Sequence, residues 1–519
     1  MIESGYRTIM VLSDSRSCDD MGTTQQTASY SYYPTHARIF GDDLAAPRHL
    51  YFSSIPAFLA LAGMLSWVFS GDPGLVLGSV AATAVSVYTL WDWLFRHAPT
   101  RLSTLLAMAL LLGYGGGALN TWLTLPRGTL SLSEIMGLGE GVLNRGIAAV
   151  LFSSALLYFF GEIFEKPIFG QSFRLQIDRT TRSLVFLGAL AMLGGYATHS
   201  LAIEGAASSE GHVSILGMFL TWLYTPITAL AVASFVTARL RREKLLAGFS
   251  SLVLILMFAV LGRRATLYTT IEILFVLALV GYRWRGKGIR NLLLIISMGA
   301  VVALCSLTFM LLRIAPLGHR IYGKMSVSQR FEAANRLMKK GNALELAAAA
   351  TRTNAQTRTF ILSFMANVFD ASITKTPALG RDAFGFLQLT IPSVIYPDKN
   401  KFFSEEGLVD QQFGFSYGDE ANSVLTAGAA DFGIVGVILY PLLIVLIARA
   451  VHDFLLQFLK PLPCMLVSLA FISLFLPTEA TLATYFSFFR NTIIFIVLIQ
   501  IYVSLPRLRL HPEYSDRVG

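Results

Sequence analysis

Residues 432–448 read FGIVGVILYPLLIVLIA, seventeen consecutive positions without a charged side chain. A helix needs about 20 mostly apolar residues to cross the hydrocarbon core of a bilayer, with a lower limit of about 17. Eleven further stretches of similar length and hydrophobicity lie at 50–70, 74–95, 102–124, 146–164, 183–203, 214–236, 245–261, 265–282, 291–312, 462–476 and 484–505. The sequence therefore predicts an all-α polytopic membrane protein with about twelve transmembrane helices.

The overall composition supports this class of protein. Charged residues make up 14% of the 519 positions and hydrophobic residues 54%, with a mean hydropathy of +0.59, whereas soluble domains carry about 25% charged residues. These values exclude an ordinary soluble enzyme, a disordered chain and a nucleic-acid-binding protein, although the net charge is +9. Cys18, Cys305 and Cys464 lack the spacing of a metal site or a disulfide framework. We expect neither a metal nor a cofactor.

The positions of lysine and arginine orient the helices. Every second connection is basic, as at 96–101, 166–182, 239–244 and 283–290. Because cytoplasmic connections are enriched in lysine and arginine, both termini are predicted to be cytoplasmic. The expected organisation is a cytoplasmic tail at 1–49, transmembrane helices 1–9 at 50–312, a large outer loop at 313–431, transmembrane helices 10–12 at 432–505 and a cytoplasmic tail at 506–519.

The loop at 313–431 contains patterns that predict secondary structure. Its 119 residues include 13 basic and 11 acidic side chains. Residues 326–350 predict a helix that lies on the bundle. The apolar face of this helix consists of Phe331, Ala334, Leu337 and Met338. The apolar stretches 360–369 and 384–396 are too short to span a bilayer, so we expect them to be buried against the membrane domain.

Four charged residues fall inside the predicted spans, where a charge costs at least about 2.5–3.5 kcal/mol near the centre. Asp92 and Glu162 lie at cytoplasmic ends, and we expect them to anchor their helices at the interface. Glu272 and Arg490 lie deeper, in the outer half of the membrane. They predict either an ion pair that closes the bundle or a polar cavity that opens outward.

Arginines collect on the predicted outer face. Arg263 and Arg264 occupy the turn between the seventh and eighth spans, and Arg313 and Arg320 follow the ninth. Arginine binds phosphate oxygens with two parallel hydrogen bonds and keeps its charge near lipid, which suits a lipid-linked pyrophosphate. A neighbouring carboxylate could take a proton from an attacking hydroxyl. The candidates for this proton acceptor are Asp410, Asp419, Glu420 and Asp431, with His319 as a further one.

Two motifs resemble those of a known family. The first is residues 422–436, NSVLTAGAADFGIVG, at the entry to the tenth span, and the second is the turn at 262–267, GRRATL. Both resemble the oligosaccharide repeat-unit polymerases of the Wzy type and the related O-antigen ligases, over roughly residues 262–451. The ligases usually carry His directly before the Asn, and Ala421 stands there, which favours a polymerase.

The resemblance implies a metal-independent, GT-C-like glycosyltransferase in the bacterial inner membrane, with the large loop on the periplasmic side. The implied reaction is the polymerisation of oligosaccharide repeat units carried on undecaprenyl pyrophosphate, for surface polysaccharides such as O-antigen or exopolysaccharide. The expected partners are this lipid-linked oligosaccharide, the lipid bilayer, a flippase and chain-length regulator proteins, and no nucleic acid.

The resemblance also implies residue roles. Deprotonation of the acceptor hydroxyl is assigned to Glu420 or Asp419, with His319 as a third choice. Asp431, Gly433 and Gly436 are expected to shape the junction between loop and helix. Substrate binding is assigned to Arg263, Arg264, Arg313, Arg320, Asn422 and Arg490.

Other classes of protein stay open at this point. An O-antigen ligase shares the topology and the motifs. A transporter or flippase of lipid-linked sugar would place Glu272 and Arg490 in a central pathway. An assembly subunit of a polysaccharide export system is a third alternative.

Overall fold

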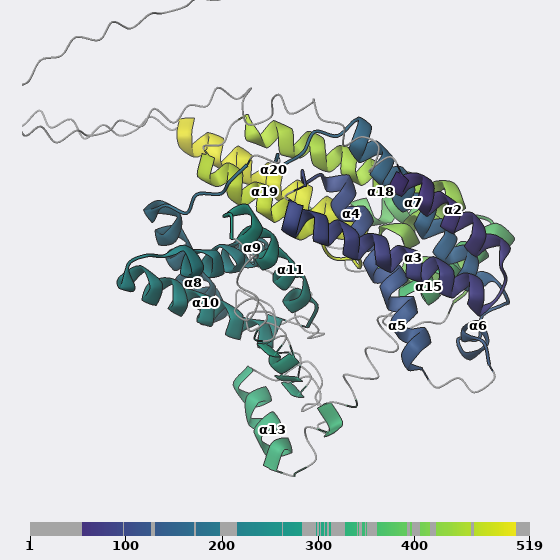
Figure 1. Cartoon of the computed structure of the whole chain (residues 1–519), viewed down its shortest axis with the longest axis horizontal. Coiled ribbons are helices and arrows are strands. Elements are labelled where there is room, and N and C mark those ends of the chain that lie inside the picture. The colour runs from purple at the N-terminus through teal and green to yellow at the C-terminus, as the bar shows by residue number, and fades with distance from the viewer. Residues whose placement is uncertain are drawn as a thin grey trace, which may run out of the picture. The chain divides into compact units, whose positions relative to one another are not determined.

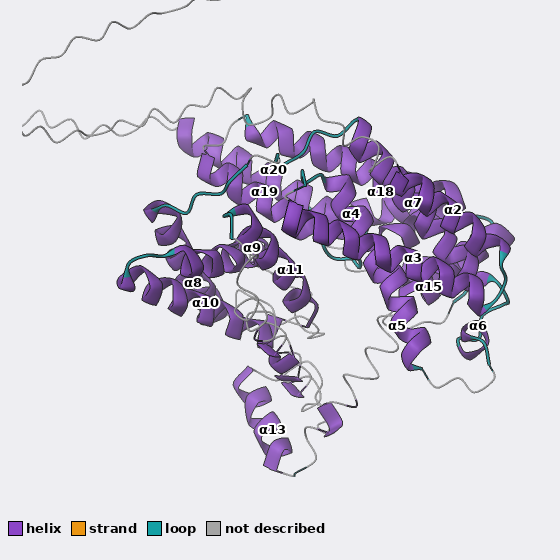
Figure 2. Cartoon of the chain, in the orientation of Figure 1, coloured by secondary structure: helices purple, strands orange, loops and turns teal. Residues whose placement is uncertain are grey.

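The computed structural model describes most of the chain between residues 54 and 504. The described segments are 54–96, 98–125, 130–170, 173–197, 215–261, 263–282, 327–339, 361–391, 405–415, 422–457 and 461–504, with single residues or short pieces at 297–312, 341–349 and 395–396. Within these segments the regular secondary structure is helical and no strand is present (Figure 1, Figure 2). The predicted all-α class is confirmed for this part of the chain.

The helices follow one another with short connections in the first half of the chain. Its elements are α2 (Ser54–Val68), α3 (Asp72–Trp91), the π-helical turn η1 (Asp92–Arg96), α4 (Leu102–Leu110), the π-helical turn η2 (Leu111–Gly116), α5 (Gly117–Thr124), α6 (Leu132–Ile135), α7 (Val142–Ile163), α8 (Arg179–Ala197), α9 (Ile215–Thr237), α10 (Arg241–Leu261) and α11 (Arg263–Leu279). The second half contributes α13 (Val327–Lys339), α15 (Ile361–Thr374), α16 (Arg381–Thr390), α17 (Glu405–Phe413), α18 (Val424–Leu456), α19 (Pro461–Phe475) and α20 (Leu482–Ser504).

Several of these helices are suited to a bilayer. Among the residues described, four helical stretches are long and apolar enough to cross a membrane on their own, namely Asp72–Arg96, Leu102–Thr124, Val142–Ile163 and Val424–Leu456. Helices also occupy the other predicted spans, apart from 291–312, which lies mostly outside the described residues. The chain has the character of a helical membrane protein, and the number of twelve spans remains a prediction.

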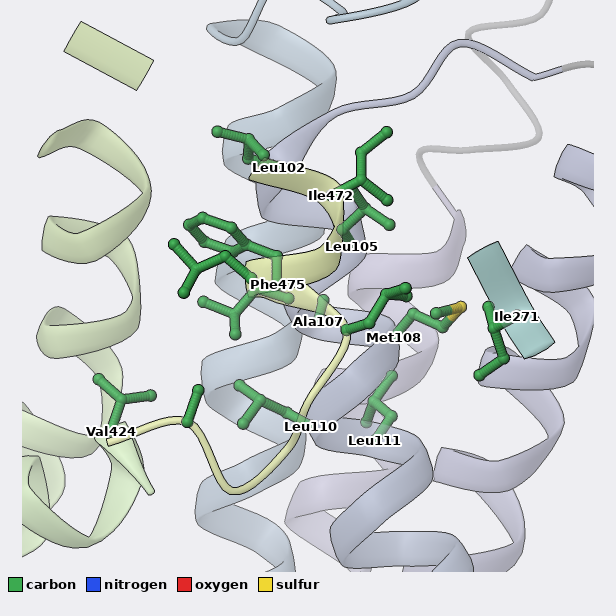
Figure 3. Packing of buried hydrophobic residues seen from close by; sticks show 14 of the residues in the cluster. Leu102, Leu105, Ala107, Met108, Leu110, Leu111, Ile271, Val424, Ile472 and Phe475 are labelled. Atoms are coloured by element: carbon green, nitrogen blue, oxygen red, sulfur yellow. The ribbon is translucent and has the colours of Figure 1, made fainter. Parts of the chain in front are cut away.

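The helix α4 lies at the centre of the packed helices. All nine of its residues are buried, as expected for a helix that is apolar on every side and surrounded by other helices. Figure 3 shows Leu105 and Leu110 of α4 beside Phe475 of α19, with Val424 at the start of α18 nearby. Residues from distant parts of the sequence therefore share one core.

The helix ends are joined by contacts that fall into two groups. In the first group, the Glu165 carboxylate accepts hydrogen bonds from the amides of Leu102 at 2.7 Å and Ser103 at 3.0 Å. A carboxylate at this position satisfies unpaired amides at the start of α4 and complements the helix dipole. Arg182 and Glu243 form an ion pair of 2.6 Å between α8 and α10. All of these residues are at ends that the sequence predicts to be cytoplasmic.

The second group joins residues of the predicted loop at 313–431 to the other ends of these helices. Asp370 of α15 forms an ion pair with Arg145 at the start of α7. Phe369 packs edge-on against Trp67 of α2, with ring centroids 6.3 Å apart. The stretch 360–369 is predicted to be buried, and seven of its nine described residues, 361–369, are buried, which confirms that expectation. The loop segment α15 thus packs at the helix ends that the sequence assigns to the outside. The same expectation of burial is wrong for much of 384–396, because Phe384 is 62%, Leu387 51% and Ile395 74% exposed.

The predicted helix at 326–350 is shorter and less buried than expected. It forms α13, which ends at Lys339, and Gly341 follows with a φ of +84° that favours glycine and ends the helix. Ala334 is buried with Leu312 as predicted. Phe331 is 45% exposed and Met338 50% exposed, so the expectation that both pack on the bundle is wrong for these two side chains.

Candidate functional site

The motif at 422–436 forms a helix that folds back on itself. Phe432 (φ −139°, ψ 18°) and Gly433 (φ 58°, ψ −134°) leave the helical region and divide α18 into two limbs, residues 424–431 and 434–456. In a straight helix, positions 428 and 436 would lie about 12 Å apart. A Cβ atom on either Gly428 or Gly436 would instead collide with the backbone of the other. The two limbs therefore pack backbone to backbone, which requires glycine at both positions.

This geometry corrects one expectation about the tenth span. The predicted span begins at 432, whereas the helical structure begins at Val424, inside the predicted loop. The first limb is buried over its whole length, so it is an inserted segment and not part of an exposed loop. Gly433 has the positive φ that an L side chain rarely adopts, and this explains the glycine after Phe432.

The first limb begins in a buried polar cluster. The Ser423 hydroxyl caps it by accepting a hydrogen bond from the Leu425 amide at 3.0 Å, and it lies 2.5 Å from the hydroxyl of Tyr114 in η2. Asn422 is 4% exposed, and its Oδ1 accepts from the Ser423 amide at 2.7 Å. Its Nδ2 has no hydrogen-bond partner among the described residues. The predicted binding residue Asn422 therefore offers one buried donor.

Asp431 ends the first limb and holds the start of α16. Its buried carboxylate accepts hydrogen bonds of 3.0 Å from the amides of Gly380, Asp382 and Ala383, and one of 2.7 Å from the Tyr440 hydroxyl. These bonds occupy both oxygens and satisfy amides that α16 leaves unpaired. The arrangement agrees with the structural role expected for Asp431 and disfavours a role as proton acceptor.

Asp382 is a further candidate carboxyl group, which the sequence patterns do not single out. Its side chain is buried at 2% exposure on α16, and its Oδ2 has no hydrogen-bond partner among the described residues. Burial and the nearby charge of Asp431 raise the pKa of Asp382 to about 7, against the opposing effect of Arg381. A general base works best when its pKa is close to the operating pH. The available signal was the sequence Gly-Arg-Asp at 380–382 before an amphipathic helix.

Arg490 and Glu272 do not form the ion pair that was one of two expectations. The Arg490 guanidinium donates to the carbonyl oxygen of Thr390 at the end of α16, and its Nε donates to Asn491 Oδ1 at 2.7 Å. Glu272 accepts from the Ser473 hydroxyl. The two charges thus have different partners in the described structure.

For the other residues assigned to deprotonation or substrate binding, the structure describes only the backbone of two and no part of the rest. Arg263 and Arg264 are the first two residues of α11, and their side chains lie outside what the structure describes. His319, Arg313, Arg320, Asp419 and Glu420 lie outside the described residues. Two of the predicted residues lie in one group of helices, because α16, α18 and α20 pack against one another. Asn422 lies just before α18, and Arg490 lies on α20.

No family model matches the chain, no curated protein matches it, and no solved structure matches it. The site must therefore be interpreted from its own geometry.

The chemistry available at the start of α16 is proton transfer beside cationic groups. Asp382 can hold or release a proton near neutral pH, and Arg381 lies next to it in the chain. Within the segments that the structure describes, no group of three or more His, Cys, Asp or Glu residues is arranged to hold a metal ion. The groups at this site that can take part in chemistry are the Asp382 carboxyl and the Asn422 amide.

Proposed function

We propose that this chain is a membrane glycosyltransferase that polymerises lipid-linked oligosaccharide repeat units at the outer face of a bacterial inner membrane. One observation carries the proposal. A segment of the predicted outer loop is packed onto the helices, and it holds a buried carboxyl group, Asp382, whose pKa is raised to about 7. The backbone amide of Asp382 donates to Asp431, which belongs to the motif at 422–436 that resembles the polymerase family.

In the proposed reaction, a sugar hydroxyl of one lipid-linked repeat attacks the anomeric carbon of another. The new glycosidic bond forms as the bond between that carbon and the pyrophosphate oxygen breaks, and the hydroxyl proton passes to the Asp382 carboxylate. Glu420, Asp419 and His319 remain the alternative proton acceptors. The leaving pyrophosphate takes both electrons of the broken bond, so the positive charge of arginine stabilises it.

The binding roles follow from the same chemistry. We assign the pyrophosphate to Arg263 and Arg264 at the start of α11, with Arg313 or Arg320 from the loop. The unpaired Nδ2 donor of Asn422 suits a sugar oxygen. Arg490 donates to Thr390, so we assign it a role in holding α16 in addition to the expected role in substrate binding.

The contacts at the helix ends support the location of the site. Asp370 contacts Arg145 and Phe369 contacts Trp67, and both partners are at helix ends predicted to lie on the outer side of the membrane. Glu165 and Arg182 lie in contacts with residues predicted to face the cytoplasm. The contacts of α15 are thus separate from those at the predicted cytoplasmic ends, as a site on the outer face would require.

The decisive experiment is reconstitution of the purified protein into vesicles with a synthetic lipid-linked repeat. We expect a ladder of longer chains, which Asp382→Asn and Arg264→Ala abolish while protein level and insertion stay unchanged. Glu332→Gln is the matched control, because Glu332 is a carboxylate of the same loop in an exposed pair with Arg336. Transfer of single repeats to a different acceptor lipid would indicate a ligase.

A transporter of the same lipid-linked sugar is the second candidate. The break in α18 favours it, since transporters build their sites from discontinuous helices near the middle of the membrane. Movement of the substrate across the vesicle membrane without any lengthening would replace the polymerase proposal by this one.

A further inference from the structure

Glu272 is a carboxylate buried among apolar helices. It lies near the middle of α11 and has no exposed surface. The Ser473 hydroxyl of α19 donates to its Oε2, while its Oε1 has no hydrogen-bond partner among the described residues. A side chain with one free oxygen in such a position is an incomplete polar site.

No described cation neutralises this carboxylate. Arg490, which the sequence places at a similar depth, donates to Thr390 and Asn491, and no described ion pair includes Glu272. The titratable or charged residues described on the elements packed against α11, or close to it, are Tyr224 of α9, Arg241, Arg242, Glu243 and Lys244 of α10, Asp92 and Arg96 of η1, Cys464 of α19, and Tyr485 and Arg490 of α20.

The residues described next to Glu272 and Ser473 in the chain include apolar core residues. Ile271, the neighbour of Glu272, and Ile472, the neighbour of Ser473, both belong to the apolar core (Figure 3). One turn earlier on α11, Thr269 shares a hydroxyl hydrogen bond of 3.2 Å with Thr225 of α9. An isolated ionised carboxylate in such surroundings is strongly disfavoured unless a positive charge accompanies it.

We propose that Glu272 is the centre of a site for a small monovalent cation, either a proton or a sodium ion. A proton would bind the free Oε1 and leave Oε2 as the acceptor for Ser473. A sodium ion would bind Oε1 together with hydroxyl or carbonyl oxygens, which are the hard ligands that such cations prefer. Ionisable residues inside a membrane domain commonly serve in cation pathways. The proposal does not depend on polymerisation of sugars.

The test uses dicyclohexylcarbodiimide, an apolar reagent that reacts with protonated carboxyl groups inside membranes. The carboxyl proton and oxygen add across the carbodiimide, and the adduct rearranges to a stable N-acylurea without an oxidant or reductant. The intact wild-type protein in vesicles is labelled over a range of pH, with sodium or with choline at equal ionic strength. The modified peptide is then identified by mass spectrometry.

The two occupants predict different results. For a proton site, labelling of Glu272 falls about tenfold for each pH unit above its midpoint, with no effect of sodium. For a sodium site, sodium protects Glu272 while choline does not. Either result supports the proposal. The absence of labelling at Glu272 at every pH, or labelling that responds to neither pH nor sodium, would overturn it.

Two serine variants provide a second measurement that leaves the carboxyl group in place. Ser473→Ala removes the hydroxyl bonded to Glu272, so we expect its labelling midpoint or sodium protection to shift. Ser468→Ala is the matched control on the same helix, because its hydroxyl lies 3.0 Å from His452 Nε2 instead. An equal response in both variants would contradict a site built around Glu272 and Ser473.

Discussion

Asp431 and Arg490 hold the opposite ends of one helix. The Asp431 carboxylate accepts hydrogen bonds from three amides at the start of α16, and the Arg490 guanidinium donates to the carbonyl of Thr390 at its end. Each charge has the sign that stabilises the helix dipole at its end. Because these residues lie on α18 and α20, the two helices together fix the position of Asp382.

The first prediction concerns Asp431. Asp431→Ala leaves three amides and the Tyr440 hydroxyl without their acceptor in a buried site. We expect the free energy of unfolding to fall by about 2–4 kcal/mol, measured by titration with a denaturing detergent. The control is the exposed ion pair between Glu332 and Arg336. Glu332→Gln should change the free energy of unfolding by less than about 0.5 kcal/mol. An unchanged Asp431→Ala variant would show that α16 is held by other contacts.

The second prediction concerns the coupling of Asp431 to Arg490. Either Asp431→Asn or Arg490→Gln should release α16 at one end and accelerate protease cleavage in residues 379–391. Once one end is free, loss of the other should have a smaller effect, so the double variant should be less damaged than the sum of the two. Strict additivity would mean that the two ends act independently.

The third prediction concerns the glycine pair in α18. Gly428→Ala or Gly436→Ala should prevent the two limbs from packing, because the added Cβ meets backbone that has no free rotation. We expect loss of folded protein after extraction in mild detergent. Gly194→Ala is the matched control in another helix, since a Cβ there meets no atom within 4 Å. Normal folding of both α18 variants would refute the close approach.

The fourth prediction is a dependence on pH. The folded pKa of Asp382, about 7, is above the ordinary value of 3.8, so the folded protein binds the proton more tightly than the unfolded chain. This contribution to stability is complete below the ordinary value and is lost as the pH rises through about 7. Asp382→Asn should remove that slope from a plot of unfolding free energy against pH.

The same group predicts the pH profile of chain lengthening. Because only the ionised carboxylate accepts a proton, the rate should rise with pH through about 7 in the wild-type protein. A rate of chain lengthening that does not change with pH through this range would exclude Asp382 as the base. Glu420, Asp419 or His319 would then be the favoured proton acceptor.

The fifth prediction concerns the two sides of the membrane. Single cysteines at Gly341 and at Lys166 should react with an impermeant thiol reagent from opposite sides, with Gly341 accessible from the periplasm. The measurement uses intact cells and inverted vesicles in parallel, in a background lacking the natural cysteines. Labelling of both positions from the same side would overturn the predicted orientation and the outer-face site.

The sequence predicted well those features that depend on local hydrophobicity. The helical stretch at 102–124 has the bounds that the sequence predicted, because apolar length and flanking charges decide where a helix can lie in a bilayer. The same pattern could not reveal that residues 424–431 belong to a buried limb, since a break at Phe432 and Gly433 depends on backbone dihedrals and on contact between two glycines.

The candidate site was less predictable. Asn422 stands out through the motif that resembles the polymerase family, and Arg490 stands out as a charge within an apolar span. The structure places both beside the helices α16, α18 and α20, which pack against one another. For Asp382 the sequence Gly-Arg-Asp at 380–382 was a weak signal, because burial and hydrogen bonding, which distinguish this carboxylate from others, depend on the tertiary structure. The sequence by itself determined the all-helical class and the apolar helices that suit a membrane, and the large loop at 313–431 stays a prediction. Only the tertiary structure decided which carboxylate is satisfied and which is free, because hydrogen bonding and burial depend on residues far apart in the chain.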